Sequence, residues 1–205
     1  MPHWKTHIEI AKRCNEFLKF NKSDYTLFLF GNILPDINNG YIISDIVTHI
    51  DRNYTHFKDN DSHKIYLNFY NEYKNNIKNP MILGYYCHLY ADYSFNNFAY
   101  PILNNNESFK NYTKDELRRF KQDEFKRYNT NFSDNNITIY DCNEILEETK
   151  KINRVKIYKD DIIKVSKYLN NGENIQNLNF FNKNDFDILI GDIVNEIKNF
   201  YFNNK

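Results

Sequence analysis

The chain has 205 residues, of which 27 are basic and 27 acidic, so its formal net charge is zero. This balance excludes a strong long-range field toward nucleic acid or anionic membranes, although a phosphate-bearing substrate stays open. The length predicts one domain over 1–205 with a sizeable core, and the 17 Tyr and 17 Phe supply much of the volume of that core.

No segment has the pattern of a signal peptide or a transmembrane helix. The N-terminus lacks a basic region followed by an apolar one, and no run of about 18 uncharged apolar residues occurs. Cys14, Cys87 and Cys142 are scattered and odd in number, which is typical neither of a disulfide framework nor of a structural zinc site with closely spaced cysteines. We therefore expect a cytoplasmic protein without a membrane span.

Helical periodicity runs through most of the chain, which holds only five glycines and four prolines. The first helix is predicted over 2–20, and a second over 23–34 with Ser23 or Asp24 as its cap. Pro35 should stop that second helix. The inward stripe of the first helix is predicted to comprise Trp4, His7, Ala11, Cys14 and Leu18.

The later segments are helical as well, and strand-like alternation is hard to find. Residues 41–49 are either a short helix or irregular, and 102–112 are predicted as a loop. Thr113 and Glu116 have the spacing of a capping box. The remaining helices are predicted over 63–74, 80–95, 113–128, 140–152, 158–170 and 183–203. This pattern predicts an all-α fold with a helical remainder over 110–205.

The apolar run 81–95 contains two ionisable side chains expected to be charged near neutral pH, His88 and Asp92. They are four residues apart and therefore share one helical face. An unpaired buried carboxylate is costly or shifts its pKa until it is neutral. The pair therefore needs partners, and a metal ion is a natural one. Gly84 and Ala91 on the same face would let another helix or a substrate approach.

Three further residues of the first half are metal-type ligands. His7 lies on the inward stripe, Asp36 ends an apolar segment, and His56 precedes a polar stretch. Mixed His and Asp ligands suit zinc, iron or manganese better than calcium or magnesium. Each candidate also has a purely structural interpretation. His7 can be a core histidine, Asp36 a helix cap and His56 a loop residue, and His88 with Asp92 can be a buried hydrogen-bonded pair. The other histidines are interpreted as surface or supporting residues, namely His3, His49 and His63.

These residues stand in four motifs, which are Thr6-His7-x-x-Ile10-Ala11, Gly31-x-x-x-Pro35-Asp36-Ile37, His56-Phe57 and Gly84-x-x-x-His88-x-x-x-Asp92. The series resembles the zinc-dependent phospholipase C family over residues 2–98. The resemblance implies the helical fold shared by bacterial phospholipases C and single-strand-specific zinc nucleases. It implies Asp36 as the general base, Asp92 as a bridge between two zinc ions, and as metal ligands His7, Asp36, His56, His88 and Asp92.

The chain also departs from that family. The three-zinc enzymes carry further histidines after the helix-borne pair, whereas no histidine follows His88 here, so a third metal set is incomplete. The secreted enzymes use the amine of an N-terminal tryptophan; here Trp4 is internal, and His3 is a candidate replacement. Acidic residues that would substitute for the missing ligands are Glu107, Asp115, Glu116, Asp123 and Glu124.

The resemblance implies a zinc-dependent phosphoester hydrolase that holds one or two ions and attacks a phosphodiester with metal-activated water. A phospholipid is the family-level substrate. A nuclease or phosphomonoesterase on the same fold is an alternative, and so is a non-catalytic metal-binding descendant. A phosphohydrolase of the His-Asp type ranks last, because the chain contains no His-Asp dipeptide.

Overall fold

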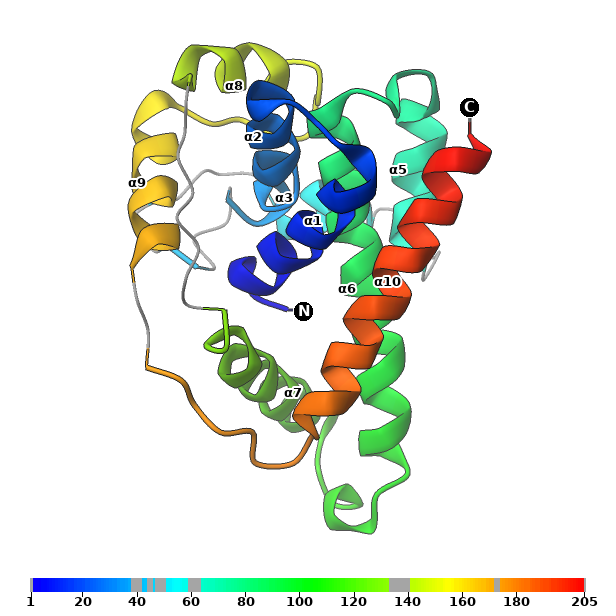
Figure 1. The fold of residues 1–205 in the computed structure, drawn as a ribbon. Coiled ribbons are helices and arrows are strands. Elements are labelled where there is room, and N and C mark those ends of the chain that lie inside the picture. Colours follow the sequence, from blue (N-terminus) through cyan, green and yellow to red (C-terminus); the bar gives the residue numbers. More distant parts are fainter. Residues whose placement is uncertain are drawn as a thin grey trace.

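The structure, a computed structural model, describes residues 2–37, 42, 43, 46, 51–58, 64–132, 141–171 and 174–204. Within these residues it contains helices and no strand, which confirms the all-α prediction. That the chain forms one domain stays a prediction. The α-helices, shown in Figure 1, are α1 (Trp4–Leu18), α2 (Lys22–Gly31), α3 (Leu34–Ile37), α4 (Arg52–Thr55), α5 (Ile65–Tyr73), α6 (Pro80–Asn104), α7 (Lys114–Asn129), α8 (Cys142–Thr149), α9 (Lys159–Asn170) and α10 (Lys183–Asn203).

Helix α6 is the central element, and α2, α5 and α10 pack around it (Figure 1). Its start follows from local chemistry. Asn79 accepts hydrogen bonds from the backbone N–H groups of Met81 and Ile82, and Pro80 fills a first-turn position that needs no donor. Residues 81–89 are buried without interruption. The apolar run is therefore a helix surrounded on most sides, as predicted.

Two glycines let α2 and α6 approach closely. A Cβ added to Gly84 would lie 2.3 Å from the carbonyl oxygen of Phe28, and one added to Gly31 would lie 2.2 Å from the carbonyl oxygen of Met81. Neither position has room for a side chain, so the two backbones are in direct contact. The close approach expected at Gly84 is therefore made by another helix.

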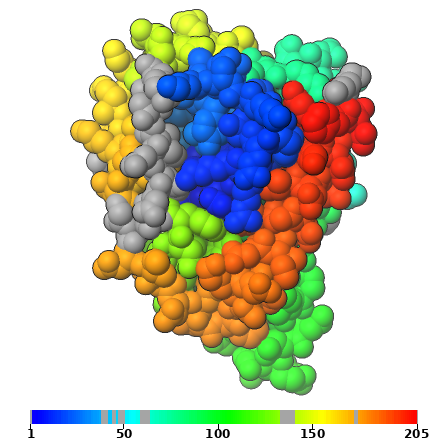
Figure 2. Space-filling model, in the orientation of Figure 1, coloured from blue at the N-terminus to red at the C-terminus, as the bar shows by residue number. Residues whose placement is uncertain are grey.

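Helix α1 packs against α10, α2, α6 and α7. Figure 2 shows the N-terminal helix and α10 side by side on one face of the molecule. Trp4, His7, Ala11 and Cys14 are buried on the inner face of α1, and Leu18 is partly buried against the core. The helical period alone therefore predicted this stripe. Among the described helices, none is long and apolar enough to cross a membrane.

Two predictions at the N-terminus are wrong. Helix α1 begins at Trp4 and not at Pro2. The cap of α2 is Asn21, whose side chain accepts from the backbone N–H of Asp24, and not Ser23 or Asp24. Asn is as good a cap as Ser or Asp, so cap propensity gives no reason to prefer Ser23 or Asp24 over Asn21.

The predicted stop at Pro35 is also wrong. Helix α2 already ends at Gly31, and Pro35 lies in the first turn of the short helix α3. A first turn has no use for the missing N–H, so proline begins this helix instead of ending the previous one. Asp36 therefore lies on a helix of its own. The predicted segment 41–49 falls mostly outside the described residues.

The loop predicted over 102–112 is shorter than expected, because α6 continues to Asn104 and a 3₁₀ turn covers Glu107–Phe109. The capping box is confirmed. Thr113 accepts from the backbone N–H of Glu116, and the Glu116 carboxylate accepts from the backbone N–H of Thr113. The helices expected in the second half are present, although α8 is shorter than predicted and ends at Thr149.

Candidate metal centre

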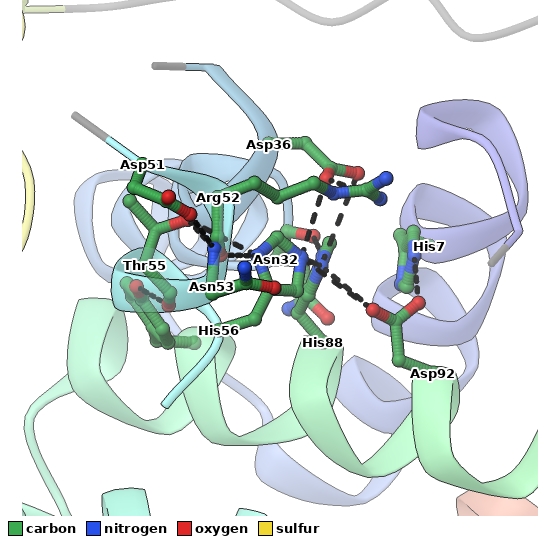
Figure 3. Close-up of polar contacts among 11 residues, drawn as sticks. His7, Asn32, Asp36, Asp51, Arg52, Asn53, Thr55, His56, His88 and Asp92 are labelled. Atoms are coloured by element: carbon green, nitrogen blue, oxygen red, sulfur yellow. Dashed lines mark hydrogen bonds and ion pairs between the residues drawn. The ribbon is translucent and has the colours of Figure 1, made fainter. Parts of the chain in front are cut away.

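The side chains proposed as ligands converge between α1, α3, α4 and α6 (Figure 3). His7 comes from α1, Asp36 from α3, His88 and Asp92 from α6, and His56 directly follows α4. None is more than 1% exposed. In the described part of the chain, their ligand atoms form two groups within 4.8 Å, one of His7, His88 and Asp92 and one of Asp36, His56 and His88.

Asp92 lies between the three histidines. Its Oδ1 is 3.6 Å from Nε2 of His7, and its Oδ2 is 3.6 Å from Nε2 of both His56 and His88. These distances exceed those of direct hydrogen bonds, and neither oxygen has a hydrogen-bond partner. A buried carboxylate in this state needs a positive charge nearby.

Asp36 occupies the opposite side of the cluster. Its Oδ1 is 3.2 Å from Nη2 of Arg52 and 3.3 Å from Nε2 of His56. Its Oδ2 is 3.9 Å from Nε2 of His88 and accepts no hydrogen bond. Burial alone would raise the pKa of Asp36, but the Arg52 guanidinium and the neighbouring histidines outweigh it and hold that pKa well below its usual range. The carboxylate is therefore ionised.

The backbone decides which nitrogen of two rings carries the proton. Nδ1 of His88 is 2.7 Å from the carbonyl oxygen of Asn32, and Nδ1 of His56 is 2.9 Å from that of Arg52. A carbonyl oxygen only accepts, so each Nδ1 donates and each Nε2 presents a lone pair when the ring is neutral. This is the orientation that metal-binding histidines use.

These lone pairs face one another and the carboxylates. Nε2 of His56 and Nε2 of His88 are 3.4 Å apart, with Asp36 and Asp92 oxygens beside them. Acceptors gathered without donors repel unless a proton or a cation lies among them. The donor set therefore fits a bound metal ion.

The protonation states agree with this interpretation. Burial, followed by the nearby His88, lowers the pKa of His7 to about 4, and burial also lowers the pKa of His56. Both rings are thus neutral near neutral pH, the form that binds metals. Burial opposes protonation of His88 too, but Asp92 outweighs it and raises the pKa of His88. A metal ion at Nε2 would replace that proton.

The two groups differ in the number of donor atoms that they offer to a metal ion. Nδ1 of His88 is used by Asn32, so His88 can offer only Nε2. With Asp36, His56 and Oδ2 of Asp92, this nitrogen makes a set of four donors, the number that zinc prefers. His7 and Oδ1 of Asp92 make a set of two. Both ring nitrogens of His7 lack hydrogen-bond partners, and the ring stacks on His88 with centroids 4.0 Å apart.

The segment that carries His56 is held from both sides. Asp51 caps α4 by accepting from the backbone N–H of Asn53. Phe57, which follows His56, is fully buried and has a φ of 56°, an uncommon value for a bulky residue. Its ring packs edge-on against Phe69 with centroids 5.1 Å apart. This packing holds the strained turn that directs His56 inward.

The remaining candidates within the described residues belong to neither group of ligand atoms. His3 is the N-cap residue of α1 and belongs to neither group, and burial lowers its pKa to about 4. Glu124 is buried, but its carboxylate accepts hydrogen bonds from the backbone N–H groups of residues 179–181. Neither group contains the other acidic candidates. His49 and His63 lie outside the described residues.

Two supporting residues were not predicted. Arg52 reaches Asp36 with its side chain and His56 with its carbonyl group, and Asn32 orients His88 through its carbonyl group. A signal existed for Arg52, which precedes His56 by four residues and therefore shares its helical face. No local signal links Asn32 to His88, because they are 56 residues apart.

Comparisons with known proteins agree with the motifs. The family model for zinc dependent phospholipase C matches residues 6–115, more than half of the 205 residues, and this range contains every residue of both groups. No curated protein and no solved structure gives a significant match. The buried His and Asp groups could hold the zinc that this family uses. The chain belongs to the zinc-dependent phospholipase C family.

Proposed function

We propose that the protein is a zinc-dependent phosphoester hydrolase in which a metal-activated water attacks a phosphodiester, with a phospholipid as the family-level substrate. The observation that carries the proposal is the set of buried acceptors facing one another without donors between them, around Oδ2 of Asp92. The proposed ligands are His7, Asp36, His56, His88 and Asp92.

Bound zinc would lower the pKa of a water and neutralise the phosphoryl charge that develops during attack. Asp36 is the proposed general base. Arg52 contacts Oδ1 of Asp36. The other carboxylate oxygen of Asp36, Oδ2, accepts no hydrogen bond and is therefore available for the proton of a water. The carbonyl groups of Asn32 and Arg52 keep the rings of His88 and His56 oriented by accepting from Nδ1–H.

The test combines metal content with turnover. Protein purified without added metal or an affinity tag should contain one or two zinc ions per chain and hydrolyse bis(p-nitrophenyl) phosphate. Asp36→Asn should lower kcat by about 10²-fold or more while most of the zinc is retained. Asp115→Asn, at a carboxylate that is 76% exposed, is the control and should change neither value. Full activity in Asp36→Asn would refute the general-base role.

A second candidate function is a non-catalytic zinc centre. It is favoured by the group of His7 and Asp92, because its third member, His88, offers only Nε2, which the other group also needs. In that case chelation would lower the melting temperature, and no phosphoester would be hydrolysed. A panel that includes single-stranded DNA and a phosphomonoester also separates the nuclease and phosphomonoesterase alternatives from the phospholipase.

A further inference from the structure

A cavity of about 430 Å³ adjoins the candidate metal centre. The two share Arg52, which lines the cavity and whose Nη2 is 3.2 Å from Oδ1 of Asp36. Four of the residues that line the cavity are basic: Arg52, Lys58, Arg118 and Lys121. None of the described lining residues is acidic, although the chain as a whole has equal numbers of both kinds.

Lys121 gives the strongest indication of an anionic ligand. It is only 3% exposed. Its ammonium group donates to Oδ1 of Asn96 and lies 3.7 Å from the ring centroid of Tyr100. No carboxylate of the described residues pairs with it. Buried lysines are rare unless they are paired, because an ammonium group without a counter-charge is costly to bury. Burial accordingly lowers the pKa of Lys121 to about 7.

Two further basic side chains of the cavity, those of Lys58 and Arg118, are exposed and open to a ligand. The side chain of Lys58 makes no hydrogen bond or ion pair with another side chain of the described segments. Arg118 pairs with Asp115 at 3.2 Å, but these side chains are 57% and 76% exposed, and pairs of that kind are weak. The side chains of Asn96 and Tyr100 add polar groups to the same wall. A cationic headgroup would be repelled here, whereas an anion would supply the missing counter-charge.

We infer that this cavity is an anion subsite that binds a second negatively charged group of the substrate, next to the phosphodiester that is cleaved. The inference rests on the proposed hydrolase function and narrows its substrate class. The preferred substrate is a phosphodiester whose headgroup carries an additional phosphate, not an amine. Arg52 lies where the two anionic groups meet, and Lys121 forms the inner wall for the second.

The first test measures specificity in the zinc-loaded protein. Soluble short-chain phosphatidylinositol 4-phosphate should be hydrolysed with a kcat/KM about tenfold or more above that of short-chain phosphatidylcholine. Glycerophosphoinositol 4-phosphate, which lacks acyl chains, separates recognition of a free headgroup from that of a lipid. Lys121→Gln and Arg118→Gln should each reduce the preference about tenfold. Lys110→Gln, at a side chain that is 74% exposed and outside the cavity, should not.

The second test measures binding without turnover. Inositol 1,4-bisphosphate titrated by calorimetry should bind the wild type more tightly than either cavity variant, with the zinc content unchanged. Arg118→Gln changes an exposed residue and keeps the test valid if Lys121→Gln fails to fold. Weaker binding in the variants without turnover of any phosphoester would support the subsite and refute the hydrolase. Turnover of bis(p-nitrophenyl) phosphate with equal headgroup rates and equal binding in all variants would refute the subsite alone.

Discussion

Replacing Gly84 with alanine should push apart α2 and α6, the second of which carries His88 and Asp92 of the candidate metal centre. The new Cβ would lie 2.3 Å from the carbonyl oxygen of Phe28, whereas ordinary contact begins at 3.4 Å, so α2 and α6 must move apart locally by about 1 Å. The obstacle is backbone, so no side-chain rotamer can relieve it. Overpacking costs about 1–3 kcal/mol, and we expect the upper end, about 3 kcal/mol.

For a chain of this length, about 3 kcal/mol corresponds to a fall in melting temperature of roughly 6–12 °C. The metal centre should suffer too, because the same Cβ would lie 3.0 Å from the backbone nitrogen of Asn32, the residue whose carbonyl group orients His88. Zinc affinity should fall about 10- to 100-fold, the usual effect of losing such a supporting contact. Circular dichroism melting and a competitive zinc chelator measure the two effects.

Gly191→Ala is the matched control. Gly191 lies inside α10, and a Cβ there would meet no atom within 4 Å. Alanine is more favourable than glycine in a helix interior by up to about 1 kcal/mol, so the control should melt about 2–4 °C higher than the wild type. The same substitution thus has opposite signs at the two sites. If Gly84→Ala melted at or above the wild-type temperature, the close approach of α2 and α6 would not hold.

Three further predictions follow from buried charges. Chelation of zinc should lower the melting temperature, by roughly 8–16 °C if zinc was near 1,000 times its Kd (about 4 kcal/mol), because the buried carboxylates of Asp36 and Asp92 lose the cation beside them. Calorimetry with and without chelator should show no shift if neither carboxylate holds a metal ion. Glu124→Ala should lower the free energy of unfolding, measured in urea, by about 3 kcal/mol, because three backbone N–H groups lose their acceptor. A similar loss of stability in the exposed control Glu107→Ala would contradict that cause. The pKa of Lys121 is lowered to about 7, so between pH 7 and 10 the unfolded chain binds a proton that the folded chain lacks. The free energy of unfolding therefore rises with pH by up to about 1.4 kcal/mol per pH unit. Urea unfolding at pH 7.5 and 9.5 should show a smaller rise in Lys121→Met than in the wild type, and the same rise in both proteins would refute the lowered pKa.

Local rules account for what was predicted correctly. The burial of the apolar run in α6 and the shared face of His88 and Asp92 follow from the helical period, which acts within four residues. The capping box at Thr113 is similarly local. The errors are local as well: Asn21, Ser23 and Asp24 were nearly equivalent caps, and only the folded chain chose among them.

The roles of two buried charged residues of α7, Glu124 and Lys121, depend on contacts with distant parts of the chain. Glu124 was a candidate metal ligand, but the segment before α10 satisfies its carboxylate with backbone donors more than 50 residues away. Lys121 lies on a helix rich in charged residues, yet it is buried against Asn96 and Tyr100 of α6. Both residues lie on the face of α7 that also carries Leu117 and Phe125, so the helical period places them inward, but it does not show which groups meet them there.

The sequence by itself determined the helices, the residue types of the candidate metal centre and the order of its motifs. Only the tertiary structure decided which atoms meet. The contact between His88 and the Asn32 carbonyl group joins residues 56 positions apart. It forms because Gly31 and Gly84 let two helix backbones come into contact. Helical period and capping are short-range properties, whereas the donors around a buried metal are brought together by long-range packing.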